Sequence, residues 1–269
     1  MYKLGSEKAI DNSRLNEIIG AAKDLVQHLK HSGLQKEIKT TLKQEITTRW
    51  NSAVTMLKSI LDNFEDIIAK LVAQNEMRFI IPIDKQQLTD IVEFMEKIKE
   101  CSEQLSGDCA PTLRLVVPWY SSLQERNRVN NCDLLILKDF KKQFSKSLQE
   151  KWILTPVHYI AAFLHPQLKH LPFLLDTNKK KTYDDVKKIM LTLGIEDIEE
   201  VEDEEPPRKI TTEFENYIAH SVPDCNNILD WWKNNKQNFP NYVNWLCSSY
   251  AYQLPKRLVK GCSQLQDAF

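Results

Sequence analysis

Apolar residues recur every three or four positions through most of this 269-residue chain, which is the spacing of one face of an α-helix. This spacing predicts helices over residues 12–32, 51–75, 86–104, 119–126, 131–151, 184–193 and 210–220. Asp84 and Gln87 resemble a capping box at the start of the third of these helices, and Gly33 suits the end of the first. The pattern therefore predicts a mainly α fold.

Three segments depart from this pattern. Residues 46–50 contain β-branched side chains and predict one short strand. Residues 152–175 are strongly apolar but interrupted by prolines, which predicts short helices buried in a core. Residues 196–207 form an acidic run that ends in two prolines. Such a run is typical of a solvated linker, and it also suits an acidic segment that attracts a basic partner.

Trp231 and Trp232 begin an aromatic helical hairpin that spans about residues 224–252. Adjacent residues on a helix point about 100° apart, so the two indoles cannot share one packing face. The hairpin either closes the protein's own core or carries an interface with another chain, and spacing alone leaves both open.

The net charge of −1 means that any contact with nucleic acid must come from a local basic patch. One candidate patch is the set Lys36, Lys39, Lys43, Arg49 and Trp50. Its cations would neutralise phosphates, and the indole would stack on an unpaired base. The alternative is that Trp50 packs in a core while the cations are solvated. No run of 18 apolar residues occurs, so no membrane-spanning helix is expected.

Residues typical of catalysis or metal binding are scattered. The six cysteines form no CxxC pair and the six histidines form no HExxH pattern. No glycine-rich phosphate loop and no GxSxG motif is present. We therefore expect no metal, no cofactor and no assembled active site.

Three motifs in a fixed order resemble the hAT superfamily of DNA transposases. Thr48-Arg49-Trp50-Asn51-Ser52 is similar to a segment of that family, and Leu164-His165-Pro166-Gln167 is similar to its leucine-aspartate-proline-arginine motif. His165 replaces the family's aspartate there, and Gln167 replaces its arginine. Ile228-Leu229-Asp230-Trp231-Trp232 resembles the start of the family's C-terminal dimerisation region.

The resemblance implies an RNase H-like core that is interrupted by a helical insertion domain. Residues 1–50 would be a remnant of that core, with its last strand at 44–49. The insertion domain would occupy residues 51–194, followed by an acidic linker at 195–209. Residues 210–269 would begin the dimerisation region. Its expected interface residues are Trp231, Trp232, Phe239, Tyr242, Trp245 and Leu246.

In the family, an Asp-Asp-Glu triad binds two divalent metals that activate the attacking hydroxyl groups. Both aspartates precede the first helix there, so we expect the chain to start after them. Lys260 stands near the position of the glutamate, and a cation cannot bind Mg²⁺. The sequence thus predicts a catalytically inactive, transposase-derived nuclear protein that binds DNA, itself or a transposase-related partner. The alternatives are a fragment of a longer active transposase and a helical interaction scaffold without a DNA role.

Overall fold

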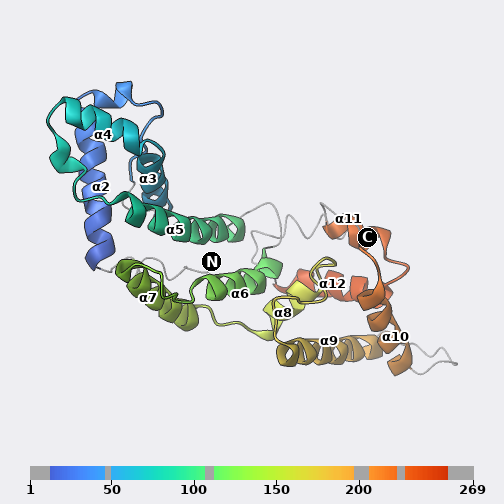
Figure 1. Ribbon diagram of the computed structural model, residues 1–269. Helices are drawn as coiled ribbons and strands as arrows, with labels where there is room; N and C mark the ends of the chain where they lie inside the picture. The colour runs from blue at the N-terminus through green and yellow to red at the C-terminus, as the bar shows by residue number, and fades with distance from the viewer. Residues whose placement is uncertain (1–12, 46–49, 107–111, 197–205, 223–227, 254–269) are drawn as a thin grey trace. The chain divides into compact units, whose positions relative to one another are not determined.

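The regular structure of the described residues is entirely helical (Figure 1). The computed structural model describes residues 13–45, 50–106, 112–196, 206–222 and 228–253. No strand occurs among them, which confirms the mainly α prediction. The strand expected at 44–50 falls largely outside this part of the chain. Residues 44 and 45 are irregular, and Trp50 already begins a helix.

The chain divides into two compact units. Unit 1 comprises residues up to 112 together with 119–153, and unit 2 comprises residues 113–118 together with 154 onwards. The domain boundaries implied by the hAT resemblance describe which ancestral domain each segment comes from, and not how the chain divides into compact units. They stay a prediction.

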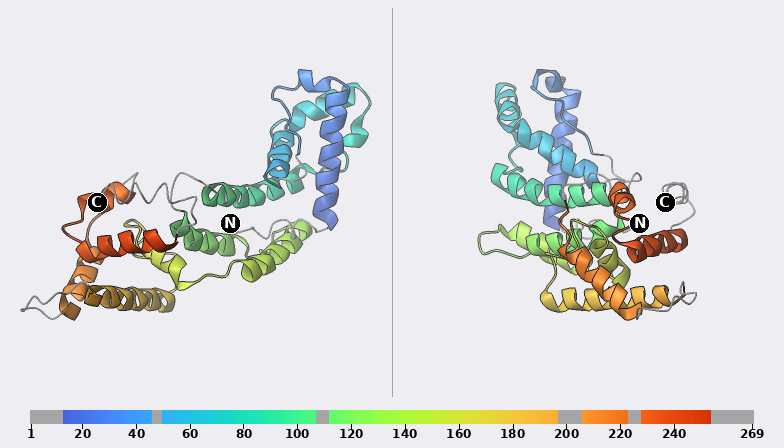
Figure 2. Two further views of the ribbon diagram at one scale, coloured as in Figure 1. Left: turned by 180° about the vertical axis from the view of Figure 1, so that it is seen from behind. Right: turned by 90° about the vertical axis from the view of Figure 1, so that its right-hand side faces the viewer.

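Unit 1 contains helices that come before and after residues 113–118 in the sequence. Its elements are α2 (Ser13–His31), η1 (Leu34–Glu37), α3 (Trp50–Asp62), α4 (Phe64–Ala73), η2 (Met77–Phe79), α5 (Lys85–Leu105), most of α6 (Val116–Arg126) and α7 (Leu135–Lys151). Helix α3 packs on α2, α4 and α5 (Figure 2). Phe94 of α5 meets Phe140 and Phe144 of α7 edge-on, at ring-centroid distances of 5.3 and 6.1 Å. These aromatic contacts pack α5 against α7.

Two predicted helix ends are confirmed. The Asp84 carboxylate accepts the backbone N–H of Gln87 at 2.8 Å, so α5 begins with the expected cap. Gly33 has a φ of 79° after α2, a left-handed conformation that glycine adopts without a steric cost. The helix predicted at 51–75 is instead two helices, separated at Asn63. The Asn63 side chain donates to the carbonyl of Ser59 at 2.7 Å and so competes with helical hydrogen bonding.

Unit 2 is built around one long helix. Its elements are η3 (Leu113–Leu115), α8 (Pro156–Phe163), α9 (Asp176–Glu196), α10 (Pro206–Ala219), α11 (Ile228–Asn234) and α12 (Pro240–Gln253). Helix α9 packs against α8, α10 and α12. It begins at Asp176, whereas the sequence predicted a start at Asp184. The prediction missed the first turns because they are lysine-rich and show little apolar periodicity.

The helical hairpin expected at 224–252 is present as α11 and α12. The proline-broken stretch 152–175 contains a single helix, α8, followed by turns. The acidic residues 197–205 lie outside the described residues. In the part of the chain that is described, no helix is long and apolar enough to cross a membrane.

Candidate functional site

The segment 34–45, which we call the basic strap, carries three of the predicted DNA-binding residues. Its apolar side chains Leu34, Ile38 and Leu42 are buried at 2%, 7% and 1% exposure. Lys36, Lys39 and Lys43 are exposed. Because the burial alternates with exposure, the strap is fixed by its apolar side and presents its lysines outward.

The strap is held on α3 and α4 through Asn63, which is 4% exposed. The Asn63 Oδ1 atom accepts the Thr40 backbone N–H at 3.3 Å and the Thr40 hydroxyl at 2.9 Å. The Lys43 backbone N–H donates to the Ser59 hydroxyl at 3.1 Å. These bonds fix the backbone at Thr40 and at Lys43, so the lysines project from a defined scaffold.

Most charges along the strap are paired. Glu37 accepts from Lys70 of α4 at 2.8 Å, and Lys39 lies 3.4 Å from Asp66. Glu45 is paired with Lys23 of α2 at 2.6 Å. Among the described residues, neither Lys36 nor Lys43 lies within ion-pair distance of a carboxylate. The strap therefore keeps two uncompensated positive charges on its outer side.

The other two residues of this predicted site are Arg49 and Trp50. Trp50 is the first residue of α3, and Arg49 lies outside the described residues. Their contribution to DNA binding stays a prediction.

The residues predicted to carry association lie in an aromatic core inside unit 2. The ring centroids of Trp231 and Trp232 lie 4.9 Å apart, and the ring planes are at 89° to each other. The two indoles therefore pack in different directions within one core. All six predicted side chains are buried at 6% exposure or less: Trp231, Trp232, Phe239, Tyr242, Trp245 and Leu246. A role in association stays a prediction, and these side chains offer a partner little surface in this conformation.

Tyr217 of α10 is the centre of the aromatic core, although it is not among the predicted site residues. Its ring contacts Trp232 at 5.4 Å, Phe239 at 5.5 Å and Tyr242 at 4.9 Å. Its hydroxyl donates to the Phe163 carbonyl at 3.0 Å. The aromatic spacing Phe214 to Tyr217 along a predicted helix is the only signal that pointed to it.

Two hydrogen bonds tie the segment that resembles the leucine-aspartate-proline-arginine motif to the core. The Trp232 indole donates to the Leu164 carbonyl at 3.2 Å. Lys169, which is 2% exposed, donates through Nζ to the carbonyl of Tyr217 at 2.6 Å and to the carbonyl of His220. Burial lowers the pKa of Lys169. This lysine therefore caps the C-terminal end of α10, where a cation is favoured by the helix dipole.

His165 in this segment is held in its neutral form. Burial, and secondarily the charge of Arg114, lowers its pKa to about 4. Its Nδ1 atom has no hydrogen-bond partner among the described residues. Protonation of His165 near the charge of Arg114 would therefore cost free energy.

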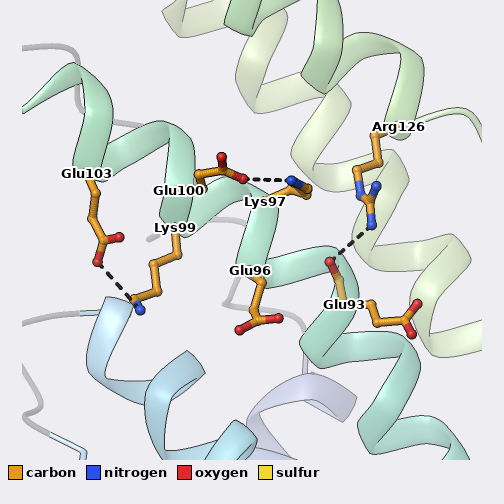
Figure 3. Close-up of a pocket in the computed structure, with 7 residues that line it drawn as sticks. All are labelled: Glu93, Glu96, Lys97, Lys99, Glu100, Glu103 and Arg126. Atoms are coloured by element: carbon orange, nitrogen blue, oxygen red, sulfur yellow. Dashed lines mark hydrogen bonds and ion pairs between the residues drawn. The ribbon is translucent and has the colours of Figure 1, made fainter.

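An open hollow of about 380 Å³ on unit 1 is lined by charged side chains of both signs (Figure 3). Lys97 pairs with Glu100 at 2.7 Å and Lys99 with Glu103 at 3.5 Å. Arg126 donates to the backbone carbonyl of Glu93 at 3.2 Å. The described residues contain no group of three or more histidine, cysteine or carboxylate side chains that could hold a metal ion. The hollow is therefore an ion-paired surface rather than a preformed ligand site.

Comparison with known proteins identifies relatives for about 60% of the chain. It is 29% identical over 168 residues to the Hobo transposable-element transposase of Drosophila melanogaster, a stretch of 61% of this chain. This protein is related to the hAT transposases. The hAT-related chain is also 26% identical over 157 residues, or 58% of its length, to zinc finger protein 618 of mouse and of human.

The matched stretch is only 26% of the Hobo transposase and 16% of zinc finger protein 618. The relatives thus include one transposase and one protein named for its zinc fingers, and they leave the catalytic status of the hAT-related chain open. No family profile matches the chain.

Proposed function

We propose that the chain is a non-catalytic, hAT transposase-derived protein that binds DNA through the basic strap. The observation that carries this proposal is the outward placement of Lys36 and Lys43 without a carboxylate partner among the described residues. Exposed cations on a fixed backbone neutralise phosphates and release counterions, which gives affinity that depends on salt and little on sequence. Arg49 and Trp50, the remaining residues of the predicted site, would add a phosphate contact and a stacking contact.

The decisive experiment measures binding of a fluorescent 20-base-pair duplex to the full chain over a range of salt concentrations. Replacing Lys36→Gln and Lys43→Gln together should weaken binding and lower the salt slope by about 2, roughly one per phosphate contact. The control variant replaces Lys142→Gln and Lys151→Gln, two exposed lysines of α7, and carries the same change in charge. Equal effects of the two variants, or an unchanged slope, would refute the strap as the contact.

The proposal of inactivity is supported by Lys260, which stands near the family's glutamate position. A lysine in place of a metal-binding carboxylate removes one ligand and adds a repelling charge. The purified chain should therefore leave nicked and hairpin DNA intact with Mg²⁺ or Mn²⁺. Metal-dependent cleavage that persists through repeated purification would favour the alternative, a fragment of a longer active transposase.

The remaining parts of the proposal concern origin and place in the cell. We propose that residues 1–50 descend from the RNase H-like core and that the protein acts in the nucleus, where a DNA-binding protein meets its ligand. Fluorescence microscopy of the tagged full chain tests the location. Self-association and binding of a transposase-related partner stay alternatives, and a helical scaffold without a DNA role would show no salt-dependent DNA binding.

A further inference from the structure

An open groove of about 200 Å³ lies between α8 and α9 on the surface of unit 2. One side, formed by α8 and the segment before it, is lined by the apolar side chains of Leu154, Pro156 and Ile160. The other side is formed by α9 and is polar, and it includes Lys181 and Asp185. The groove therefore combines an apolar wall, which is stabilised by being covered, with two charged groups that can select what covers it.

The two charges in the groove are unpaired. Among the described residues, neither Lys181 nor Asp185 lies within ion-pair distance of an opposite charge. They are four residues apart on one helix, but a lysine that precedes an acidic residue is the less favourable order for a pair within a helix. Asp185 is half-buried, so its carboxylate has lost part of its water without gaining a cation. A partner that supplies a cation to Asp185 and an anion to Lys181 would satisfy both groups.

Tyr183, midway between the two charges, shows which way they point. Its ring contacts Phe163 and Phe214 in the interior, at ring-centroid distances of 5.6 and 5.5 Å. Successive residues of a helix are turned by about 100°, so the residues two positions before and after Tyr183 point to the opposite, outer side. Lys181 and Asp185 therefore share the outer face of α9 and are separated by one helical turn.

A helix face with this arrangement is complementary to a second copy of itself that runs in the antiparallel direction. A two-fold axis opposite Tyr183 places Lys181 of each copy against Asp185 of the other, because the axis exchanges equivalent positions. The other groove residues of α9, Asn178 and Thr182, carry no charge, so they meet no like charge in this register. A parallel arrangement would instead set lysine against lysine. The charges thus favour an antiparallel second copy as the occupant of the groove.

We propose that a second copy of the chain covers this groove, with the two α9 helices antiparallel and with reciprocal Lys181–Asp185 ion pairs across the two-fold axis. The incoming helix covers the apolar wall, and its long lysine side chains bring aliphatic carbons as well as charge. Covering the wall excludes water from the ion pairs, which strengthens them. The interface uses neither the aromatic core nor the basic strap, so it is independent of the proposed DNA binding.

Charge reversal tests this interface by sedimentation of the full chain over a range of concentrations, at about 0.1 M salt. The parent should form dimers. Lys181→Asp or Asp185→Lys alone turns both ion pairs into repulsions, and each should weaken the dimer about tenfold or more. An equimolar mixture of the two variants should restore the dimer as a heterodimer, because each aspartate of one chain then faces a lysine of the other.

The matched controls Lys180→Asp on α9 and Asp24→Lys on α2 make the same charge changes at exposed positions outside the groove. They should leave the dimer as it is in the parent. A parent that stays monomeric, groove variants that act no more strongly than the controls, or a mixture that does not restore the dimer overturns the proposal. A dimer that is lost in Trp232→Phe and kept in both groove variants also overturns it, and supports the hairpin as the interface.

A carbodiimide cross-link tests the antiparallel register. The reagent condenses an amine with an adjacent carboxylate to form an amide, and it takes up the water that is released. In an equal mixture of ordinary and heavy-isotope-labelled chains, mass spectrometry should find Lys181 linked to Asp185 between a light and a heavy peptide. Links confined to peptides of one isotope, or no link at these residues in a dimeric sample, would overturn the register.

Discussion

Glu213 of α10 caps the start of α12 through the backbone of Tyr242. Its carboxylate accepts the Tyr242 N–H at 3.2 Å and the Asn241 side-chain amide at 2.6 Å. Glu213 is only 7% exposed, so the charge is held in the interior by one helix end and one amide. Burial raises the pKa of Glu213 in spite of these hydrogen bonds.

The two roles of Glu213, hydrogen-bond acceptor and buried charge, can be separated by substitution. Since its pKa is raised in the folded state, its contribution to stability is full at acid pH and falls as the pH rises through the raised pKa. Glu213→Gln keeps an acceptor without the charge, so its melting temperature at pH 7 should equal or exceed that of the parent. Glu213→Ala should cost about 1–3 kcal/mol, because the N–H of Tyr242 loses its partner. Thermal unfolding at pH 5 and 7 checks both, and a Gln variant much less stable than the parent at pH 7 would contradict the assignment.

His165 should make unit 2 sensitive to acid. Its pKa is lowered to about 4, so the unfolded chain binds a proton before the folded chain does as the pH falls below 6.5. Relative to His165→Gln, the parent should lose about 2 kcal/mol of stability between pH 7 and 5. Urea unfolding at these pH values provides the measurement. An NMR titration is the independent check: Arg114→Gln should raise the pKa of His165, and a parent His165 that titrates near 6.5 would refute the prediction.

Trp232 should act as a core residue in solution. It is 1% exposed, and Trp232→Ala should cost about 3–5 kcal/mol of unfolding free energy. Trp232→Phe should cost less, although it loses the hydrogen bond to Leu164. The control Leu175→Ala removes an apolar side chain that is 75% exposed and should change stability by no more than about 0.5 kcal/mol.

Solution mass decides whether the same residue also carries association. If unit 2 is a self-contained core, the mass of the folded protein is the same for the parent and for Trp232→Phe. A parent that is dimeric and a variant that is monomeric with an unchanged melting temperature would instead support the interface role.

Asn63 should control the basic strap without changing its charge. Asn63→Ala removes the acceptor of both Thr40 hydrogen bonds and should cost about 1–3 kcal/mol. The amides of Thr40 and Lys43 should then exchange faster with solvent, and duplex affinity should fall. Thr40→Ser keeps the hydroxyl and serves as the control. Unchanged amide exchange in Asn63→Ala would show that the strap is fixed by its apolar side chains alone.

Local patterns in the sequence were sufficient to predict most helices of this fold. Amphipathic spacing predicted α2, α5 and α7, and the Asp84 cap and the Gly33 end were read from single residues. These features depend on neighbours in the chain, so a single sequence contains the information.

Features that depend on distant residues were missed. The break at Asn63 involves Thr40, which lies 23 residues away, and the carbonyls bound by Lys169 lie 48 and 51 residues away. Charged residues such as Lys169 and Glu213 are expected at the surface, so their burial cannot be inferred without the partner helices. The strap lysines could be named from the sequence as a candidate basic patch. The apolar side of the strap, which orients them, became evident only from the structure.

The contact between Phe163 and Tyr217, at 5.3 Å, joins parts of unit 2 that lie on opposite sides of the acidic run 197–205. Helices α8 and α9 come before that run and α10 to α12 come after it, yet they enclose the same aromatic core. Cleavage at a protease site engineered into the run should therefore break the polypeptide without separating the two pieces. The two halves, made as separate polypeptides, should reassemble when mixed, which makes unit 2 a candidate for a split reporter.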